Sequence, residues 1–536
     1  MEYAINLATS AQNNQTAIIP TTEDIDEIKK KLSQIMYNIG FYELSAEASD
    51  SSNINDHWLK WHLMENSLHV RGNGYQSHVI EIYKETFAPH DEFLKRFYGF
   101  DSKDILETIT RLDFLIMSKI GNTAGAMATW QRFNEWSSGK GKGFISKDSI
   151  ETEQNLIQQF LEDNPDLSDQ SNPMNITLQT LDNVSGYNKI FWVIPETDKQ
   201  KKLFELLSQQ FGDNISFTQG KFSGFPLGDS LVNLKPLIKV NEKFYCFSTH
   251  LPFRNIFNIT ANLLQLADGI YYDQYFRGNK SYNSRDNYIE RKTKEFFEKL
   301  LPDVRFYHSL KYNIIEEGIG KNAELDILGI GSESIYIIEV KAGELNKKHR
   351  RGAILGLKDR LTETINEGSY QCFRAEKFIK DDATPQFTYN ENANSNILKI
   401  DMSRPYNLYK IVVTYEYFST LSVNLKYLID AGVLNTAYKW AWTVSLYDLM
   451  IFSELIENEA DFIEYLNYRL SLYERSDYEF ADEIDILGFF LDNNFPLPPE
   501  KENEKKLVMP FRATIDEYYA GKVLNIKNTI KPIRKR

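Results

Sequence analysis

Two carboxylates and a lysine lie at the ends of two short apolar segments of this chain. Glu339 and Lys341 follow the apolar run in SIYIIEVKAG (334–343), and Asp326 lies within AELDILGI (323–330). Three residues separate the two segments, a spacing typical of a β-hairpin. Side chains alternate along a strand, so Glu339 and Lys341 share one face of the sheet. Charged groups at the end of a buried strand are costly, which makes them candidates for chemistry.

The turn between the two strands decides which residues face each other. A turn centred on Ser332 and Glu333 places Asp326 directly across from Glu339. A turn centred on Gly331 and Ser332 shifts the pairing by two positions, and the same faces still meet because the side-chain period is two. Both registers bring Asp326 and Glu339 to one end of the sheet.

These charges have a chemical and a structural interpretation. Two facing carboxylates repel each other unless a proton or a cation lies between them. Oxygen ligands suit a hard cation such as Mg²⁺ or Mn²⁺, which keeps several waters and takes phosphate oxygens as its remaining ligands. The structural alternative is a cross-strand ion pair of Lys341 with Glu324 or Asp326, worth under about 1 kcal/mol if it is exposed. That alternative does not explain why three acids, the third being Glu339, should meet one lysine.

The elements around the hairpin predict an α/β unit with a mixed sheet. Ser284 is a candidate cap for a helix over 285–301, which ends before Pro302. The remaining elements are a strand, the hairpin, a long and mostly helical segment and two further strands, predicted over 304–313, 323–330, 334–343, 349–380, 408–418 and 439–448. The order is therefore α-β-β-β-α-β with another strand after it, which places helices against a central mixed sheet.

The hairpin AELDIL…IEVKAG resembles the active-site hairpin of the PD-(D/E)xK nuclease superfamily. The element order, over residues 284–420, resembles the core of its restriction-endonuclease-like fold. The resemblance implies that Asp326 and Glu339 hold a metal ion. It also implies that Lys341 positions and helps to deprotonate the attacking water and stabilises the phosphorane-like transition state. The proline that often precedes the aspartate is replaced here by Leu325.

The resemblance also implies further site residues. An upstream helix often supplies another carboxylate, for which Glu290 is the better match and Glu295 the reserve. A glutamine on the helix after the lysine strand is common in several branches, and Gln371 fits that position. With Mg²⁺ or Mn²⁺ as the cofactor, the implied metal ligands are Asp326, Glu339, Val340 and Glu290. The implied catalytic residues are Asp326, Glu339, Lys341, Glu290 and Gln371.

The expected reaction is metal-assisted phosphodiester hydrolysis by an endonuclease. Between Lys341 and Lys380 the chain carries ten Lys or Arg against five Asp or Glu, although its formal net charge is −14. We expect nucleic acid to bind this basic stretch, whose alternative is a solvated helix face. The candidate contacts are Lys347, Lys348, Arg350, Arg351 and Arg374.

The substrate is expected to be DNA, because most members of the superfamily cut DNA, and an RNase is the alternative. Two rival interpretations stay open. One is a catalytically silent nuclease fold that serves as a nucleic-acid or protein scaffold. The other is a globular protein of a different class, in which the hairpin charges form only an ion pair.

The chain is long enough for several domains, and changes in composition predict four regions. A mostly helical N-terminal domain is expected over 1–160, and a polar, turn-rich connection follows it. A mixed α/β region is expected over 174–280, a nuclease-like domain over 281–450 and a helical extension over 451–536.

Composition also limits where the protein is expected to act. The N-terminus lacks the basic and apolar regions of a secretory signal, and no apolar run reaches the roughly 18 residues of a membrane span. The only cysteines are Cys246 and Cys372, which suits a reducing cytoplasm and argues against a disulfide framework. By analogy with large fused nucleases, we expect a cytoplasmic protein of restriction or antiviral defence. Its further partners would be a second copy of the chain or another protein of a defence system.

Overall fold

The computed structural model describes residues 2–536 with gaps. The gaps are 13–20, 48–53, 69–73, 138–189, 279–280, 351–353, 392–393, 500–505, 509–510 and 527–528, with the single positions 317, 474, 476, 498 and 525. The described residues combine helices with mixed β-sheets, which confirms the predicted mixed α/β class. They form two compact units, called unit 1 and unit 2 below: Met1–Ser33 with Phe87–Ile270, and Gln34–Thr86 with Tyr271–Arg536.

Unit 1 is mainly helical and contains a small sheet with the strand order β1–β4–β3–β2. The segment KVNEKFYCFS (239–248) contains a hairpin turn, because Asn241 has a φ of 54° and turns the chain between Val240 and Lys243. Asparagine adopts this left-handed conformation more readily than most residues. The strands are β1 (Trp192–Val193), β2 (Ser208–Gln209), β3 (Leu237–Val240) and β4 (Lys243–Tyr245).

The helices of unit 1 are mostly short, apart from α6. They are α1 (Glu2–Ser10), η2 (Ala88–His90), α5 (Asp91–Tyr98), α6 (Ser102–Ser137), α10 (Asp198–Leu207), η5 (Ile215–Thr218), α11 (His250–Arg254) and α12 (Ile256–Ala267). Three helices have residues in both units, α2 (Thr22–Glu47), α13 (Gly269–Tyr271) and α4 (Gln76–Phe87), of which α4 has only Phe87 in unit 1.

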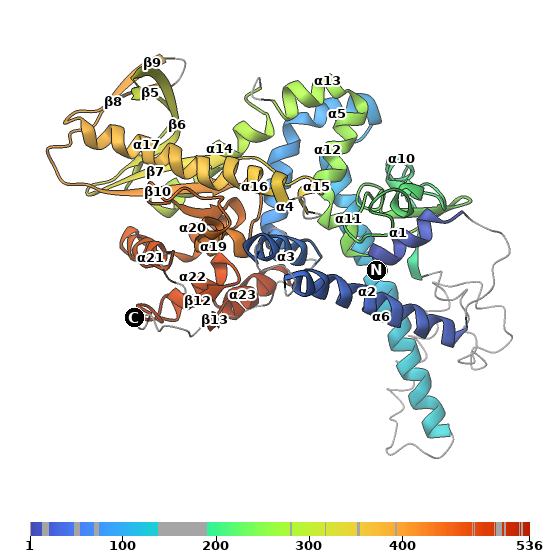
Figure 1. Ribbon diagram of the computed structural model, residues 1–536. Helices are drawn as coiled ribbons and strands as arrows, with labels where there is room; N and C mark the ends of the chain where they lie inside the picture. Colours follow the sequence, from blue (N-terminus) through green and yellow to red (C-terminus); the bar gives the residue numbers. More distant parts are fainter. Residues whose placement is uncertain are drawn as a thin grey trace. The chain divides into compact units, whose positions relative to one another are not determined.

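Unit 2 is built on a seven-stranded mixed sheet with the order β11–β10–β7–β6–β5–β8–β9 (Figure 1). The first three strands of that order are parallel to one another, and the remaining neighbours pair antiparallel. The strands are β5 (Arg305–Glu316), β6 (Ile319–Ile330), β7 (Ser334–Lys341), β8 (Gln386–Glu391), β9 (Asn394–Lys399), β10 (Asn407–Thr414) and β11 (Trp442–Ser445).

Two helices cover opposite faces of this sheet. The long helix α17 (Glu367–Asp381) places Cys372 in the same core as Ile337 of β7. On the other face, α14 (Arg285–Leu300) packs Phe297 against Phe306 of β5, which in turn contacts Tyr336 of β7. Figure 1 shows α17 lying along the strands. The central strands of the sheet are therefore covered by helices on both sides, as the near-continuous apolar run of β7 requires.

Strand β7 owes its burial to its central place in the sheet. From Ser334 to Val340 every residue is buried, and β10 pairs with the whole length of the strand. A run of isoleucine and valine suits such a position, since both of its faces meet apolar neighbours. The charges of Glu339 and Lys341 consequently lie where this buried strand ends.

The other helices of unit 2 surround this sheet or follow it in the chain. They are α3 (Ile54–Leu68), α4 (Gln76–Phe87), η6 (Tyr272–Phe276), α15 (Lys347–Arg350), α16 (Ile354–Leu361), η7 (Thr362–Asn366), α18 (Thr420–Val423), α19 (Leu425–Asp430), α20 (Leu446–Leu455), α21 (Glu459–Leu472), α22 (Glu483–Leu491) and α23 (Ala513–Val523). A small parallel pair completes the unit, β12 (Tyr478–Phe480) with β13 (Lys506–Val508).

Two local features differ from the sequence-based expectations. Strands β8 and β9 were not predicted, because their sequence is rich in Asn and poor in β-branched residues. Ser284 does precede α14, but its hydroxyl makes no capping hydrogen bond, and its Oγ is buried with no partner among the described residues. The helix begins there without the predicted cap.

The predicted division into four regions stays a prediction. The expected connection near residue 160 lies in 138–189, outside the described residues. The expected boundary near residue 280 falls close to Tyr271, where the second segment of unit 2 begins. In the described parts of the chain, no helix combines the length and the hydropathy needed to cross a membrane. Both cysteines are buried and carry free thiols.

Candidate active site

The ladder between β6 and β7 shows which turn the chain makes. Ile327 pairs with Ile338, and continuing this register by one step places Asp326 across from Glu339. This is the register of a turn centred on Ser332 and Glu333. The ladder ends there because an Asp326 carboxylate oxygen (Oδ2) accepts a hydrogen bond from the main-chain N–H of Val340, at 2.8 Å. The side chain of Asp326 is thereby fixed beside the end of β7.

Glu339 is a buried carboxyl whose hydrogen bonding is incomplete. Its side chain is 3% exposed, and Lys341 Nζ lies 3.4 Å from its Oε2. Its Oε1 has no hydrogen-bond partner among the described residues. Burial raises the pKa of Glu339 well above its ordinary value, and the carboxylate of Asp326 raises it further. The two carboxyl groups are close enough to share a hydrogen bond, which needs a proton on one of them.

Asp326 is also harder to ionise than an ordinary aspartate. Burial raises its pKa to about 6, and the negative charge of Glu290 adds to the rise. The N–H of Val340 and the charge of Lys341 act in the opposite direction. Two facing carboxyls with raised pKa values form a site that is stabilised by a proton or by a cation between them.

Helix α17 positions the ammonium group of Lys341. Its Nζ donates a hydrogen bond to the side-chain oxygen of Gln371, so the predicted glutamine does meet the predicted lysine. The lysine stem passes over Gly368, where a Cβ would lie 3.3 Å from Lys341 Cε and 2.9 Å from Val412 Cγ1. A glycine one turn before Gln371 therefore leaves room for the lysine. Glycine is rare in helix interiors, so this one is a usable sequence signal.

The replacement Gly368→Ala is expected to lower both stability and any activity of the site. An added methyl would push against Val412, a fully buried residue of β10, and against the lysine stem. Overpacking costs about 1–3 kcal/mol of stability. The higher helix propensity of alanine offsets about 1 kcal/mol of this cost. Thermal melting measures the net loss. The matched control is Gly356→Ala in α16, whose Cβ meets only the His349 ring at 3.2 Å, and an unchanged or higher melting temperature is expected there.

The chain after Lys341 is held by residues that the sequence did not single out. Arg285, the first residue of α14, is 4% exposed and donates to the carbonyl of Ala342 at 2.9 Å. It also donates to the carboxylate of Glu344. Gly343 is packed under Arg360, because a Cβ would fall 1.9 Å from its guanidinium. The end of β7 is therefore fixed on both sides of Lys341.

The backbone of β5 is distorted opposite Asp326. Ser309 has a φ of 53°, which is uncommon for a residue other than glycine, and it occupies the register position across from Asp326. The alternation of side chains along β6 is interrupted at this row. Leu328, before the loop, and Leu325, beyond Asp326, both point into the same core, although one is at an even and the other at an odd position. Glu324 is consequently exposed, across from Lys311, and does not join the site. Regular alternation along one strand predicts that Glu324 and Asp326 share a face of the sheet, and this prediction is wrong.

The two upstream carboxylates have different surroundings. Glu290 of α14 lies 3.3 Å from His308 Nε2 and is close enough to Asp326 to raise its pKa. Glu295 pairs with Lys292 at 3.4 Å, so it is directed to a different cluster. The structure therefore places Glu290, and not the reserve Glu295, near Asp326. His308 of β5 was not predicted, because a single histidine in a strand gives no signal of its neighbours.

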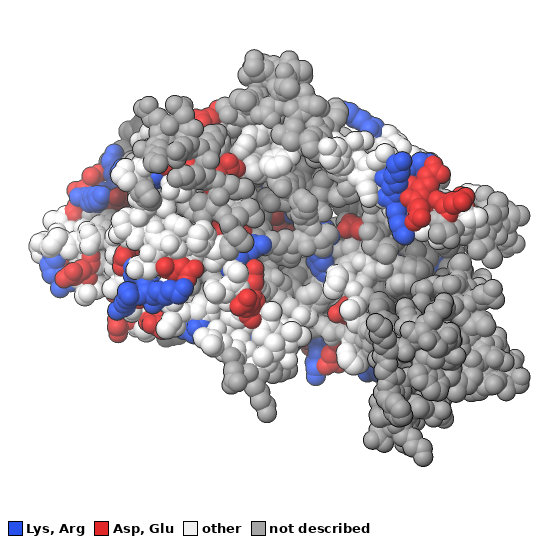
Figure 2. Space-filling model, turned by 90° about the horizontal axis from the view of Figure 1, so that it is seen from below, with Lys and Arg blue, Asp and Glu red and all other residues white. Residues whose placement is uncertain are grey.

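The predicted nucleic-acid contacts are only partly described. The side chains of Lys347 and Lys348 and all of Arg351 lie outside the described residues. Arg350 forms an ion pair with the buried Glu416 at 2.6 Å, which gives it a structural role. Arg374 of α17 lies 3.5 Å from the Tyr312 hydroxyl. On the face drawn in Figure 2, several of the described basic side chains lie beside acidic ones.

The described residues fit a divalent cation only in part. No group of three or more His, Cys, Asp or Glu side chains is arranged to hold a metal among them. What they provide is the Asp326–Glu339 pair, in which the buried Oε1 of Glu339 has no hydrogen-bond partner among the described residues. Hard acceptor oxygens with no hydrogen on them are the donors that Mg²⁺ and Mn²⁺ prefer. Val340, the remaining predicted ligand, is 7% exposed and contributes its N–H to Asp326.

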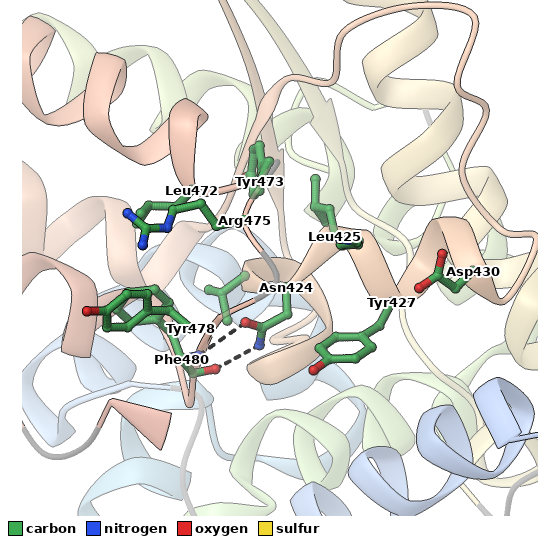
Figure 3. Close-up of a pocket in the computed structure, with 11 residues that line it drawn as sticks. Asn424, Leu425, Tyr427, Asp430, Leu472, Tyr473, Arg475, Tyr478 and Phe480 are labelled. Carbon is green, nitrogen blue, oxygen red and sulfur yellow. Dashed lines mark hydrogen bonds between the residues drawn. The ribbon is translucent and has the colours of Figure 1, made fainter. Parts of the chain in front are cut away.

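A separate cavity of about 120 Å³ lies elsewhere in unit 2, between α19 and β12 (Figure 3). Its polar groups already have partners. The amide of Asn424 bonds the main chain of Phe480 in both directions, and Arg475 pairs with Asp477 at 2.6 Å. None of the predicted site residues lines it. The cavity is therefore not the candidate active site.

Comparison with known proteins adds no family to this picture: no family model, no curated protein and no solved structure matches the chain. The candidate site rests on its own geometry.

Proposed function

We propose that this protein is a divalent-metal-dependent nuclease of the PD-(D/E)xK type that hydrolyses phosphodiester bonds, in DNA rather than RNA. The observation that carries the proposal is the pairing of Asp326 with the buried Glu339, whose Oε1 lacks a partner among the described residues. Lys341, held by Gln371, lies beside this pair. A structural ion pair would leave one acid and one base matched, whereas here two acids compete for one lysine.

The arrangement of elements supports the proposal. Helix α14, strands β5, β6 and β7, helix α17 and strand β10 follow each other in the order that the resemblance implies. The hairpin β8–β9 is inserted between α17 and β10. Helices α14 and α17 cover the two faces of the central strands, and the acids and the lysine lie at the end of β7.

Each residue of the site has a role in the proposed reaction. Asp326 and Glu339 would hold Mg²⁺ or Mn²⁺, with Glu290 nearby as a further acid. When bound, such a cation supplies charge neutralisation and makes its water more acidic. Lys341 stabilises the negative charge that develops on the phosphate, and Gln371 fixes the direction of its ammonium. Arg374, on the same helix as Gln371, would contact the nucleic-acid backbone.

The direct test is incubation of the purified protein with linear, circular and single-stranded DNA and with RNA. Each substrate is combined with Mg²⁺, with Mn²⁺ or with chelator. Metal-dependent cleavage of DNA is the expected result, and cleavage of RNA alone would correct the substrate while keeping the reaction. Binding without cleavage under all conditions would favour the silent scaffold. A protein that neither binds nor cleaves any of these substrates would overturn the proposal.

The raised pKa values predict opposite effects of pH on the apo and metal-bound protein. Below the ordinary carboxyl range both folded and unfolded chains are protonated. As the pH rises towards 6, the unfolded chain ionises first, so the Asp326–Glu339 pair makes the apo protein less stable. Protonated carboxyls do not bind metal, so the rise in melting temperature caused by Mn²⁺ should be present at pH 8 and lost as the pH falls through about 6.

Melting curves at pH 5 and pH 8, in chelator and in millimolar Mn²⁺, measure both effects. The control is Glu339→Gln, which has one carboxyl fewer. The difference between the melting temperatures of the parent and of this variant at each pH cancels the titration of the acidic groups that both proteins share. A parent protein whose metal response is the same at both pH values would contradict the assignment of these two carboxyls.

The basic stretch predicts a salt-dependent contact with the nucleic-acid backbone. Replacing Lys347, Lys348 and Arg351 by glutamine should weaken binding and lower the slope of log affinity against log salt. Each lost phosphate contact reduces that slope by roughly 0.7–0.9. Arg350 is left in place because removing it would leave Glu416 buried without its partner. The control replaces Lys29 and Lys31 of α2, which pair with acidic neighbours, and an equal slope in both variants would identify the stretch as a solvated face.

The wider setting of the reaction is part of the proposal. A cytoplasmic role in restriction or antiviral defence follows from analogy with large fused nucleases. A second copy of the chain or another defence protein would then be the partner. Size measurement of the purified protein, with and without DNA, tests self-association.

A further inference from the structure

Two neighbouring side chains of β5 are joined in a way that a regular strand does not allow. Successive residues of a strand direct their side chains to opposite faces of the sheet. The hydroxyl of Ser309 nevertheless lies 3.1 Å from Nδ1 of His308, within hydrogen-bond distance. The left-handed backbone of Ser309, with its φ of 53°, interrupts the alternation and makes this contact possible. Such a conformation costs free energy in a residue other than glycine, and strain of this kind is concentrated at functional sites.

The other nitrogen of the His308 ring faces a carboxylate of helix α14. Nε2 of His308 lies 3.3 Å from Oε2 of Glu290. This nitrogen is buried and makes no well-aligned hydrogen bond with any described residue. Hydrogen bonds of catalytic sites are often long or poorly aligned without a ligand and tighten when one binds. The contact is therefore of the kind that a working site would complete.

The carboxylate opposite Nε2 decides which ring nitrogen carries the hydrogen. A neutral imidazole has one N–H donor and one acceptor nitrogen, whereas an ionised carboxylate only accepts. The hydrogen is consequently favoured on Nε2 of His308, and the Ser309 hydroxyl then donates to Nδ1. Ser309 thus fixes both the orientation of the ring and the place of its hydrogen, and the ring directs an N–H at Glu290.

This series of contacts adjoins Asp326. His308 pairs with Ile327, the residue next to Asp326 on β6, and Ser309 occupies the position across from Asp326. Burial, followed by the negative charge of Glu290, raises the pKa of Asp326 to about 6. The register and the charge agree in placing Glu290 near the candidate active site.

The candidate active site has carboxyls on both faces of the sheet. His308 contacts α14 through Glu290, so these two side chains lie on the α14 face. Glu339 lies on the α17 face, two residues after Ile337 of the core that α17 covers. Asp326 lies where the β6–β7 ladder ends and interacts with the acids of both faces. A carboxylate held on the α14 face would give a cation at Asp326 a further oxygen ligand.

We propose that His308 and Ser309 are positioning residues that hold the carboxylate of Glu290 beside Asp326. This inference rests on the proposed nuclease function and adds two residues that set the strength of metal binding without touching the metal. Partners that orient a metal ligand typically change metal affinity by about 10- to 100-fold when they are lost. The competing account is an ion pair of His308 with Glu290 that only stabilises the fold.

The test measures Mn²⁺ binding through the rise in melting temperature at pH 8, over a range of Mn²⁺ concentrations and without nucleic acid. His308→Leu keeps an apolar side chain but removes the N–H, so about 10- to 100-fold more Mn²⁺ should be needed for the same rise. His308→Gln places an amide N–H about where Nε2 lies and should bind Mn²⁺ nearly as well as the parent.

The variant Ser309→Gly separates strain from positioning. Glycine adopts a positive φ readily, so this variant should melt no lower than the parent in chelator. It lacks the hydroxyl that fixes the ring of His308, so its affinity for Mn²⁺ should fall. A residue with a purely structural role would not give these two changes together. This variant also decides the matter if His308→Leu does not fold.

The matched control is a second histidine and glutamate pair of unit 2. Nε2 of His62 in α3 lies 3.4 Å from Oε1 of Glu479, a contact of nearly the same length. His62→Leu should lower the melting temperature in chelator and leave the response to Mn²⁺ as it is in the parent.

The outcomes distinguish this inference from the proposed function. A parent that shows no rise with Mn²⁺ overturns the proposed metal site and the inference with it. A parent that responds, together with His308→Leu and Ser309→Gly variants that respond equally, overturns the positioning role alone. A His308→Gln variant as weak as His308→Leu also overturns it, because the imidazole itself would then be required.

Discussion

Replacing Glu339 by glutamine is expected to abolish nucleic-acid cleavage while raising the melting temperature in chelator. The parent holds two buried carboxyls against each other, and the Oε1 of Glu339 has no hydrogen-bond partner among the described residues. A glutamine amide would donate to Asp326 with its nitrogen and accept from Lys341 with its oxygen. Satisfying a buried group of this kind is worth about 1–3 kcal/mol.

The loss of activity should be large because the variant loses an anionic oxygen donor. A metal ion contributes several kcal/mol to such reactions, and each 1.4 kcal/mol changes a rate tenfold, so a fall of about a thousandfold is expected. The variant should gain little stability from added Mg²⁺ or Mn²⁺. Asp326→Asn should behave in the same way, since its remaining carbonyl oxygen can still accept from the Val340 N–H.

Melting curves with chelator and with millimolar metal distinguish this account from a structural ion pair. If the acids only served Lys341, removing either one would leave the lysine unpaired and lower the melting temperature, and metal would have no effect on any protein. Variants that melt lower in chelator, together with a parent that ignores metal, would refute the nuclease site.

Replacing Lys341 by methionine or alanine should remove cleavage and leave folding nearly intact. The ammonium lies beside the Glu339 carboxyl and is oriented by Gln371, so it is the cation best placed to stabilise charge on a bound phosphate. Loss of one such group typically costs a factor of about 10²–10³ in rate. Methionine keeps the apolar stem over Gly368, so its free energy of unfolding should change by about 1 kcal/mol or less.

Comparing methionine with alanine separates the charge from the packing. Both variants lack the ammonium and should be equally inactive, whereas only alanine loses the stem. The metal-induced rise in melting temperature should persist in both, because Asp326 and Glu339 are unchanged. Cleavage within about tenfold of the parent in the methionine variant would show that Lys341 has no role in the reaction.

The inner part of the hairpin was predictable from sequence because its causes are local. Apolar strands on both sides of Gly331, Ser332 and Glu333 restrict the register to two choices of equal parity, and the ladder adopts one of them. These relations depend on side-chain period and turn length, which a sequence displays directly. The placing of Gln371 near Lys341 was instead implied by the resemblance to the nuclease superfamily, and the two side chains do form a hydrogen bond.

Other features depend on conformations or partners that a sequence does not display. Ser309 gives no sign of its left-handed backbone, so the change of face that exposes Glu324 could not be anticipated. The hairpin β8–β9 is poor in the β-branched residues that mark a strand, and the packing of Phe387 and the pairing of Thr388 with Lys311 hold it on the sheet. Arg350 was predicted to contact phosphates because it lies in a basic run, and its ion pair with Glu416, 66 residues further along the chain, is visible only in the structure.

The left-handed residue Ser309 also divides the hairpin β5–β6 into parts that can evolve separately. Asp326 of the candidate site lies in that row, and beyond it the two strands form the extension that adjoins β8. Two-residue insertions or deletions in the extension keep every side chain on its face. Such changes would move the outer sheet relative to Asp326, which stays where it is. A designer could therefore exchange the hairpin extension without altering the row that holds this carboxyl.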